Sequence, residues 1–225
     1  MATLQLLINR NLFVKDPQDT ELGRKIVQQG IIVIDCLGFE KFTFKKLARE
    51  IDSTEASIYR YFENKHKLLI YLHAWYWNWL EYRIDFQTQN IEDPVRKLEI
   101  ALKILAEKKT RDPFFPQIDE EALYRIIVDE YDKGYLTKQV DEDNKEGLFR
   151  GMKSLCHKVA TMITKVNGEY PYPHSLVSTV FHAAHQQLFY AQHLPSLTEV
   201  SDRYGDMNLQ IEKFIRSLVF NSIKQ

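Results

Sequence analysis

The chain has 225 residues, which is enough to bury a sizeable core, and 44% of them are hydrophobic and 27% charged. This composition is ordinary for a soluble globular protein. The formal net charge is −1, so overall electrostatics alone does not indicate a nucleic-acid binder. The uncharged stretch of residues 170–198 contains Gln, His, Ser and Pro, which argues against a membrane span.

The first elements in chain order are an arm and a helix. Residues 1–18 are expected to form an N-terminal arm that ends at Asp16 and Pro17. A helix is expected from Asp19 to Leu37, because its apolar residues recur at helical spacing. Gly38 follows directly and is a natural C-terminal stop, since glycine adopts the left-handed conformation without strain.

Two short helices joined by a tight turn are expected over residues 42–62. The first has one apolar stripe at i, i+3, i+4 and i+7, formed by Phe44, Leu47, Ala48 and Ile51, and Thr43 can cap its start. Residues 52–54 break the pattern, and a second helix is expected over residues 55–62. Because such a short helix is not stable alone in water, packing against its neighbour must hold it in place. This arrangement predicts a helix-turn-helix, whose second helix enters the DNA major groove.

Longer helices are expected in the rest of the chain, and no strand is indicated. They cover residues 64–86, 93–110, 119–133, 140–166, 174–193 and 206–223. The segment 174–193 carries no formal charge on any face. Because a surface helix normally keeps a charged face in water, we expect this helix to be covered nearly all round. The predicted fold class is all-α.

Several short runs lie in and around the helix-turn-helix. They are Phe39-Glu40-Lys41-Phe42-Thr43, Leu47-Ala48, Ser57-Ile58-Tyr59-Arg60-Tyr61-Phe62, Asn64-Lys65 and Leu68-Leu69. These runs resemble the N-terminal domain of the tetracycline-repressor (TetR) family of bacterial regulators, over about residues 20–70. The family usually has Gly at the turn where this chain has Asp52, a residue that tolerates the left-handed conformation better than most.

The resemblance implies a domain organisation and a function. We expect an arm (1–18), a helix-turn-helix DNA-binding domain (19–66) and a helical ligand-binding and dimerisation domain (67–225). Such a protein would be a sequence-specific regulator, in this family most often a repressor, that binds a palindromic operator in double-stranded DNA as a homodimer. The sequence leaves open whether the protein represses or activates. It also leaves open whether the arm is disordered, packs on the domain or lies along DNA.

The candidates for DNA contact follow from their places on the two short helices. They are Thr43, Lys45, Lys46, Thr54, Glu55, Ala56, Ser57, Tyr59, Arg60, Tyr61 and Lys65. Thr43 and Lys65 begin helices and are expected to bind phosphates, as the two tyrosines could also do. The residues best placed for base edges are Glu55, Ala56, Ser57 and Arg60, because Arg favours guanine, Glu accepts from cytosine and Ala touches the thymine methyl.

The two C-terminal helices predict a dimer. Two such helices from each of two subunits would form a four-helix interface with two-fold symmetry, as in the TetR family. The expected interface residues are His182, His185, Gln186, Phe189, Ile211, Phe214, Ile215 and Leu218. The alternative is that the helix over 174–193 is the central helix of a monomer's core.

A small hydrophobic or aromatic effector is the expected ligand. The pocket candidates are Trp75, Trp79, Tyr82, Phe115, Tyr124, Phe149 and His157. Such a ligand would release the repressor from DNA if it favours one conformer over the other.

Catalytic motifs are missing from the sequence. It has no Gly-rich phosphate loop, no Gly-x-Ser-x-Gly elbow and no Cys-x-x-Cys pair, so neither an enzyme nor a cofactor is expected. His182 and His185 stand at i, i+3, but no Cys or carboxylate is near them in sequence, so no metal site is expected. Without a signal peptide, the predicted location is cytoplasmic. Two alternatives remain: a DNA-binding dimer without a ligand, and a helical protein-interaction module with a vestigial helix-turn-helix.

Overall fold

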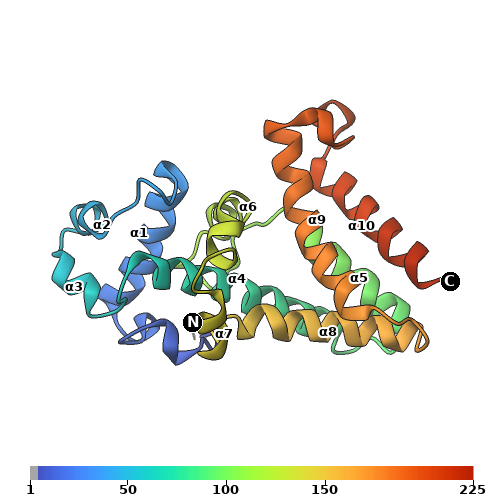
Figure 1. The fold of residues 1–225 in the computed structure, drawn as a ribbon, viewed down its shortest axis with the longest axis horizontal. Coiled ribbons are helices and arrows are strands. Elements are labelled where there is room, and N and C mark those ends of the chain that lie inside the picture. The colour runs from blue at the N-terminus through green and yellow to red at the C-terminus, as the bar shows by residue number, and fades with distance from the viewer. Residues whose placement is uncertain (1–4, 225) are drawn as a thin grey trace. The chain divides into compact units, whose positions relative to one another are not determined.

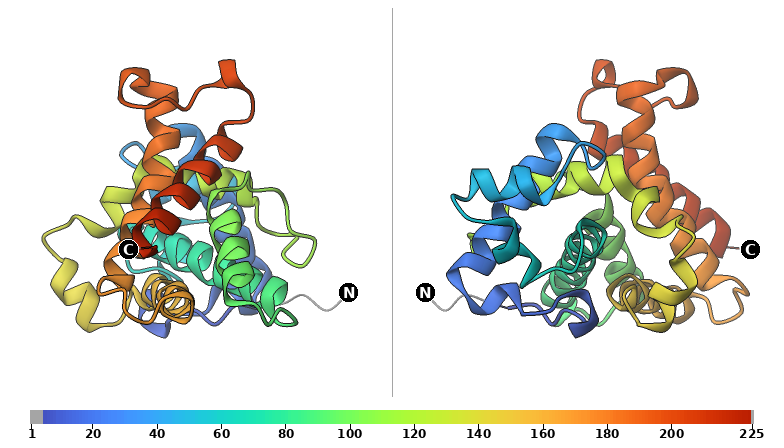
Figure 2. Two further views of the ribbon diagram at one scale, coloured as in Figure 1. Left: turned by 90° about the vertical axis from the view of Figure 1, so that its right-hand side faces the viewer. Right: turned by 60° about the vertical axis from the view of Figure 1, so that its left-hand side comes forward.

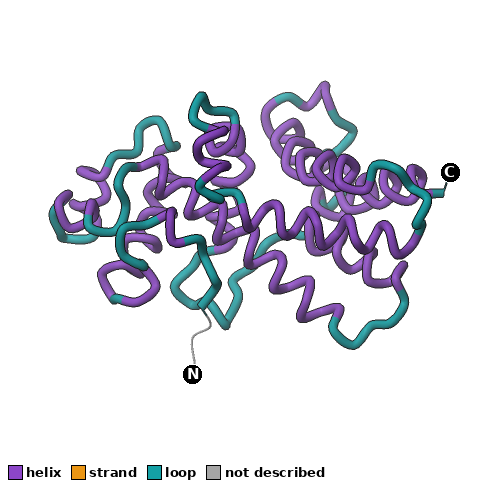
Figure 3. The backbone as a smooth tube through the Cα atoms, turned by 60° about the horizontal axis from the view of Figure 1, so that its bottom comes forward, coloured by secondary structure: helices purple, strands orange, loops and turns teal. Residues whose placement is uncertain are grey.

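The computed structural model describes residues 5–224, which form ten α-helices and four short 3-10 helices (Figure 1). The α-helices are α1 (Glu21–Leu37), α2 (Phe44–Glu50), α3 (Glu55–Tyr59), α4 (Lys65–Thr88), α5 (Pro94–Ala106), α6 (Glu120–Tyr135), α7 (Val140–Lys145), α8 (Arg150–Val166), α9 (Pro173–His193) and α10 (Met207–Ile223). The 3-10 helices are η1 (Arg10–Leu12), η2 (Pro17–Asp19), η3 (Pro195–Leu197) and η4 (Asp202–Tyr204). No strand occurs in the described residues (Figure 3), which confirms the predicted all-α fold class.

The chain divides into two compact units. Unit 1 covers the described residues up to 78 together with 109–151, and unit 2 covers 79–108 and 152–224. Unit 1 therefore combines the predicted helix-turn-helix domain with α6, α7 and residues 5–18 of the arm. The first four residues of the predicted arm lie outside the described residues. The predicted domain boundary at residue 66 follows the family's domains rather than these compact units, and it stays a prediction.

Side-chain caps explain where the first three α-helices begin. The hydroxyl oxygens of Thr20, Thr43 and Thr54 accept hydrogen bonds from the backbone N–H three residues later, at 3.0, 3.2 and 3.2 Å. At the other end of α1, Gly38 has a φ of 74° and its N–H donates to the Ile34 carbonyl at 2.8 Å. The predicted cap at Thr43 and the predicted stop at Gly38 are confirmed.

The region predicted as one helix over residues 140–166 contains two helices, so that prediction was wrong. α7 ends at Lys145, α8 begins at Arg150, and Gly147 between them has a φ of 74°. A residue in the left-handed region cannot continue an α-helix. The helix predicted to end at Thr110 also stops early, because the backbone at Glu107 is extended.

Polar contacts join α6 to α1 in unit 1. Arg125 on α6 donates two hydrogen bonds to the carboxylate of Asp35 on α1, at 2.9 and 2.8 Å. Glu130 on α6 accepts a hydrogen bond from the backbone N–H of Phe39, just beyond α1, at 2.8 Å. The Glu130 side chain is buried, so this bond holds the loop between α1 and α2 against α6.

In unit 2, α10 packs against α5 and α9, and Figure 2 shows α9 and α10 side by side. The buried stripe of α10 consists of Ile211, Ile215, Val219 and Ile223. Arg216 on the same helix donates to Glu99 on α5 at 2.7 Å. The core of unit 2 thus takes one face of α10, and Phe214 on another face stays 44% exposed.

Candidate nucleic-acid interface

The turn between α2 and α3 uses a left-handed aspartate. Asp52 has a φ of 52° and is the one non-glycine residue in the described chain with a positive φ. The N–H of Ser53 donates to the carbonyl of Ala48 at 2.8 Å, which closes the end of α2. The prediction that the turn forms with Asp52 in the left-handed conformation is confirmed.

The recognition helix α3 is held by its buried side. Ile58 has no exposed surface, and the Tyr59 ring packs edge-on against Phe44 of α2 with 5.0 Å between ring centroids. The helix ends at Tyr59 and not at Phe62 as predicted, since a turn begins at Arg60. A helix of five residues is not stable alone, so these contacts with α2 keep it in place.

Most of the predicted contact residues have accessible side chains. Thr43, Lys45, Lys46, Thr54, Ala56, Tyr59 and Arg60 are exposed, Glu55, Ser57 and Lys65 are partly exposed, and Tyr61 is buried. The exposed face of α3 therefore carries the side chains that were expected to read base edges. Their contact with DNA stays a prediction.

Two of the predicted phosphate ligands are engaged within the fold. The Lys65 ammonium donates to the carbonyl oxygens of residues 39, 40 and 42 at 3.0–3.3 Å and lies 4.6 Å from the Phe39 ring centroid. Its three donors thus match three carbonyls of the loop between α1 and α2. The hydroxyls of Tyr61 and Thr20 share a hydrogen bond at 2.8 Å. Phosphate contact by either residue would have to compete with these bonds.

Sequence reasoning did not place the arm beside the recognition helix. The N–H of Val14 donates to the carbonyl of Tyr61 at 2.8 Å, and the exposed Lys15 has its Nζ 5.6 Å from the Tyr61 ring centroid. Of the alternatives left open, the described part of the arm therefore packs on the domain. No local pattern indicates this contact, because the two segments lie far apart in sequence.

Burial shifts the pKa of two titratable side chains of unit 1, His73 and Glu120, in opposite directions. His73 on α4 is 1% exposed, and neither of its ring nitrogens has a hydrogen-bond partner among the described residues. Burial lowers the pKa of His73 to about 3, so the ring is neutral at physiological pH. Glu120 at the start of α6 accepts a hydrogen bond from the Asp112 N–H at 3.2 Å, and burial raises its pKa to about 7.

An open groove of ≈ 630 Å³ lies in unit 2, lined by residues of α4, α5 and α8. Tyr82, Phe86 and Met162 supply apolar lining, and the first two rings stack with 6.2 Å between centroids. Lys97, Lys158 and Lys165 supply cationic lining. Lys158 is paired with Glu81 at 3.1 Å and with Asp85. Glu81 and Asp85 also line the groove, so it combines an aromatic wall with charges of both signs, and Lys97 and Lys165 lie outside the Lys158 ion pairs.

The seven predicted pocket residues do not all lie together. Tyr82 and His157 line the groove in unit 2, and Trp79 is buried in the same unit. The other four are buried in unit 1: Trp75, Phe115, Tyr124 and Phe149. The Trp75 and Phe115 rings pack edge-on, with 5.3 Å between centroids. Ligand contact stays a prediction for all seven.

The predicted dimer residues divide into a buried and an accessible set. Ile211, Ile215 and His185 are buried within unit 2, Phe214 and His182 are exposed, and Gln186, Phe189 and Leu218 are partly exposed. Phe214 and Leu218 line a second open groove together with residues 170–172. The accessible set is available to a partner subunit, and dimer contact stays a prediction.

The geometry of α2, the turn and α3 defines a helix-turn-helix protein of the kind that binds DNA and regulates transcription. Residues 26–72 match the family model described as bacterial regulatory proteins, tetR family. The N-terminal region of the chain is therefore similar to the DNA-binding regulators of the TetR family over residues 26–72.

Several solved structures share the fold of this chain. AibR, solved in complex with isovaleryl coenzyme A and operator DNA, is 14% identical with a TM-score of 0.58, covering 88% of this chain and 98% of its own. The fatty acid degradation regulator FadR from Bacillus halodurans is 18% identical with a TM-score of 0.61, covering 87% and 93%. A TetR-family transcriptional regulator from Bordetella parapertussis 12822 is 13% identical with a TM-score of 0.58, covering 88% and 95%. No curated protein matches this chain in sequence.

The possible metal-ligating side chains of residues 5–224 are dispersed. No three His, Cys, Asp or Glu side chains there are grouped so that they could hold a metal ion. His182 and His185, the pair weighed from the sequence, differ in accessibility, since His182 is exposed and His185 is buried. None of the described helices combines the length and the hydropathy that crossing a bilayer would require.

Proposed function

We propose that the chain is a homodimeric repressor that binds a palindromic operator and is released by a small ligand. The observation that supports this proposal is that the recognition helix has one buried and one exposed side. Its inner face is fixed by the buried Ile58, whereas Thr54, Ala56 and Arg60 are exposed. A short helix presented in this way fits the DNA major groove, where side chains such as arginine discriminate between base pairs.

The accessible part of α10 supports a dimer. Phe214 is 44% exposed and lines an open groove with Leu218, Tyr170 and Tyr172. A second copy would remove this apolar surface from water and give a two-fold symmetric contact. Two recognition helices related by that symmetry would bind half-sites about 34 Å apart, which is why the expected operator is palindromic.

The groove between α4, α5 and α8 supports the ligand. Its aromatic residues Tyr82 and Phe86 fit an apolar group, while Lys97 and Lys165 fit an anionic one. AibR was solved with isovaleryl coenzyme A, and FadR regulates fatty acid degradation. We therefore expect an amphipathic effector, with an acyl coenzyme A thioester as the first class to test.

Release from DNA requires that the ligand favours one conformer over the other. Within unit 1, α6 is joined to the loop before α2 by the Glu130–Phe39 bond, and to α1 by the Arg125–Asp35 pair. A displacement of α6 would therefore move the helix-turn-helix. These bonds are the contacts through which we expect the ligand's effect to reach the recognition helix.

DNA binding is tested by selecting genomic fragments with the purified full-length protein and measuring affinity by fluorescence anisotropy. On a selected fragment, Arg60→Ala is expected to weaken binding by about 10- to 100-fold and to relax the preference at one base pair. Arg203→Ala, which removes an exposed arginine of η4, is the matched control and should leave affinity unchanged. Failure of the wild-type protein to enrich any fragment at moderate salt would contradict the proposed function.

The ligand is tested separately, with thermal shift and operator release across a series of acyl coenzyme A thioesters. We expect a rise in Tm and loss of operator binding with at least one chain length. One observation favours the alternative of a ligand-independent dimer: five of the seven predicted pocket residues are buried in the cores of the two units. Operator binding that no thioester weakens would support that alternative.

A further inference from the structure

Residues Asn9–Lys15, here called the strap, are firmly packed into unit 1. Leu12 in the middle of the strap has no exposed surface. The neighbouring Phe13 ring lies edge-on to Tyr71 of α4, with 6.2 Å between ring centroids. The strap is therefore part of the core of unit 1, although it precedes every α-helix in the chain.

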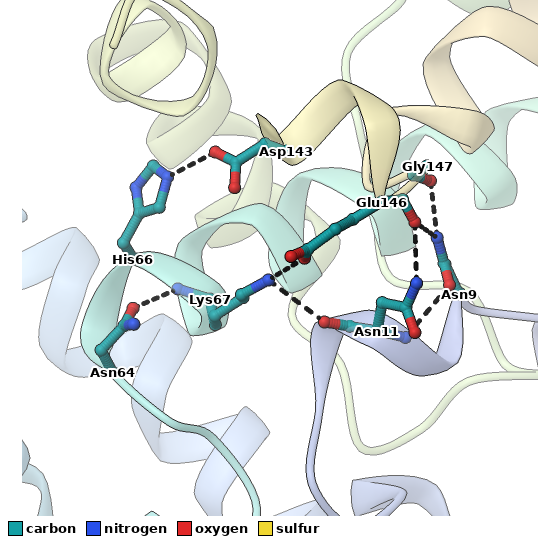
Figure 4. A network of polar contacts seen from close by, with 8 residues as sticks. All are labelled: Asn9, Asn11, Asn64, His66, Lys67, Asp143, Glu146 and Gly147. Atoms are coloured by element: carbon teal, nitrogen blue, oxygen red, sulfur yellow. Dashed lines mark hydrogen bonds and ion pairs between the residues drawn. The ribbon is translucent and has the colours of Figure 1, made fainter. Parts of the chain in front are cut away.

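One end of the strap binds the turn between α7 and α8 (Figure 4). The side-chain amide of Asn9 donates to the carbonyls of Glu146 and Gly147, at 3.0 and 2.6 Å. The amide of Asn11 donates to the Glu146 carbonyl at 2.9 Å. Gly147 is the left-handed residue that separates the two helices, and α8 begins three residues later. The strap thus supplies partners for the backbone oxygens that the end of α7 leaves free.

The first turn of α4 binds the same segment. The Lys67 ammonium donates to the Glu146 carboxylate at 2.7 Å and to the Asn11 carbonyl at 3.3 Å, as Figure 4 shows. Next to it, His66 Nε2 and Asp143 Oδ2 of α7 lie 3.2 Å apart. The strap, the start of α4 and the α7–α8 turn are therefore joined by one polar network.

The other end of the strap reaches the recognition helix. The Val14 N–H donates to the carbonyl of Tyr61, which lies two residues after the end of α3, at 2.8 Å. Lys15 follows at the Tyr61 ring. Only Leu12 and Phe13 lie between Asn11 and Val14, so the chain between the two attachment points is too short to absorb a large displacement.

We propose that the strap is a brace that couples the Glu146–Gly147 turn, and with it the start of α8, to the carboxyl end of the recognition helix. Because α3 is too short to hold its own position, a change in the turn alters its placement through the Val14–Tyr61 bond. The effect on DNA binding rests on the proposed function. The mechanical coupling itself does not, and it can be measured without DNA or ligand.

Hydrogen exchange on the full-length protein provides that measurement. Asn9→Ala with Asn11→Ala removes the three amide bonds to the turn without touching α3. Amide exchange of residues 59–63 is expected to become about tenfold faster, the size that losing a brace of a few hydrogen bonds would give. Asn90→Ala, at an exposed asparagine after α4, is the matched control and should change neither segment.

The outcomes distinguish a strap that holds residues 59–63 in place from one that is attached to them without stabilising them. Faster exchange in the strap with unchanged exchange in residues 59–63 would overturn the proposal. If the double variant exchanges faster everywhere, including α10, its fold is lost, and Asn11→Ala alone replaces it. That single variant removes one bond and should still speed exchange of residues 59–63 by about threefold. Wild-type rates in residues 59–63 of a folded Asn11→Ala variant would likewise overturn the proposal.

DNA affinity gives a second readout that tells the two proposals apart. On a selected operator fragment, the double variant should bind about three- to tenfold more weakly with an unchanged salt slope, because no phosphate-binding cation is removed. Undiminished affinity would contradict the strap's effect on DNA binding. If the wild-type protein selects no fragment, the proposed function fails, whereas the exchange result still decides whether the strap is a brace.

Discussion

The recognition helix α3 and the last helix α10 differ in the chemistry of their exposed faces. Each buries one apolar side, through Ile58 in α3 and through Ile211 and Ile215 in α10. The outer face of α3 carries polar and charged groups, whereas the outer face of α10 carries Phe214. A polar exposed face fits a hydrated duplex, and an apolar one fits another protein surface.

The two helices also differ in how much they depend on their surroundings. α10 has 17 residues and α3 has five, so α3 relies far more on its neighbours for its position. This dependence makes the recognition helix sensitive to its supports, which include α2, the loop after α1 and the strap. A sensor that moves those supports slightly would change DNA binding, while α10 would be little affected.

The largest expected effect is loss of the buried side of α3. Ile58→Ala removes a fully buried side chain and should lower the free energy of unfolding of unit 1 by about 2–5 kcal/mol. Urea unfolding followed by far-UV circular dichroism measures this. Ile32→Ala is the matched control, because Ile32 on α1 is 45% exposed and should cost far less. Equal losses for the two variants would show that α3 does not depend on this contact.

The outer face of α10 is tested by adding charge. Phe214→Glu should convert a dimer into monomers and weaken operator binding by about 100-fold or more, because the two half-sites would no longer be bound as one unit. Light scattering gives the molar mass and anisotropy gives the affinity. Phe114→Glu, at another half-exposed phenylalanine, should change neither. A dimer that survives Phe214→Glu would place the interface elsewhere.

The sequence predicted features that neighbouring residues determine, and it did not predict features that depend on residues far apart in the chain. The caps at Thr43 and Gly38 and the left-handed Asp52 follow from a few neighbouring residues. The break at Gly147 was missed because a single glycine is tolerated in many helices. The polar residues 141–146 were therefore joined to the apolar stripe that begins at Leu148.

The roles of side chains were harder to predict than the helices that carry them. Lysine at the start of α4 suggested a phosphate ligand, yet Lys65 donates to carbonyls in the loop after α1. Those carbonyls lie more than 20 residues earlier in the chain, so no local pattern reveals them. The attachment of the strap to the α7–α8 turn, across more than 130 residues, was beyond sequence reasoning for the same reason.

A pH effect is expected from the interior of unit 1, and it should be smaller than the effects of the two substitutions above. Burial raises the pKa of Glu120 to about 7 from its ordinary value near 4.5, so the folded protein holds a proton that the unfolded chain releases. Stability from this proton is fully present below pH 4.5 and is lost as the pH rises through 7.

Denaturant unfolding at several pH values between 4.5 and 8 tests this. Glu120→Gln stays neutral, so its free energy of unfolding should fall less steeply with pH than that of the wild type. The stability of the variant relative to the wild type should therefore be highest at pH 8. Glu92→Gln, at an exposed glutamate before α5, should follow the wild-type profile. Parallel profiles for Glu120→Gln and the wild type would mean that Glu120 is ionised in the folded protein at neutral pH.

The smallest expected effect concerns two adjacent lysines on α2, and it sharpens the description of the polar face. Lys46 already donates to the Lys41 carbonyl at 2.7 Å, whereas Lys45 is exposed, so Lys45 is the better candidate for a phosphate. If it neutralises one phosphate, Lys45→Ala should reduce the slope of log affinity against log salt by about 0.9, on every DNA sequence alike. Lys138→Ala, between α6 and α7, is the control. A sequence-dependent loss with an unchanged slope would instead assign Lys45 to a base edge, which would extend base reading from α3 to α2.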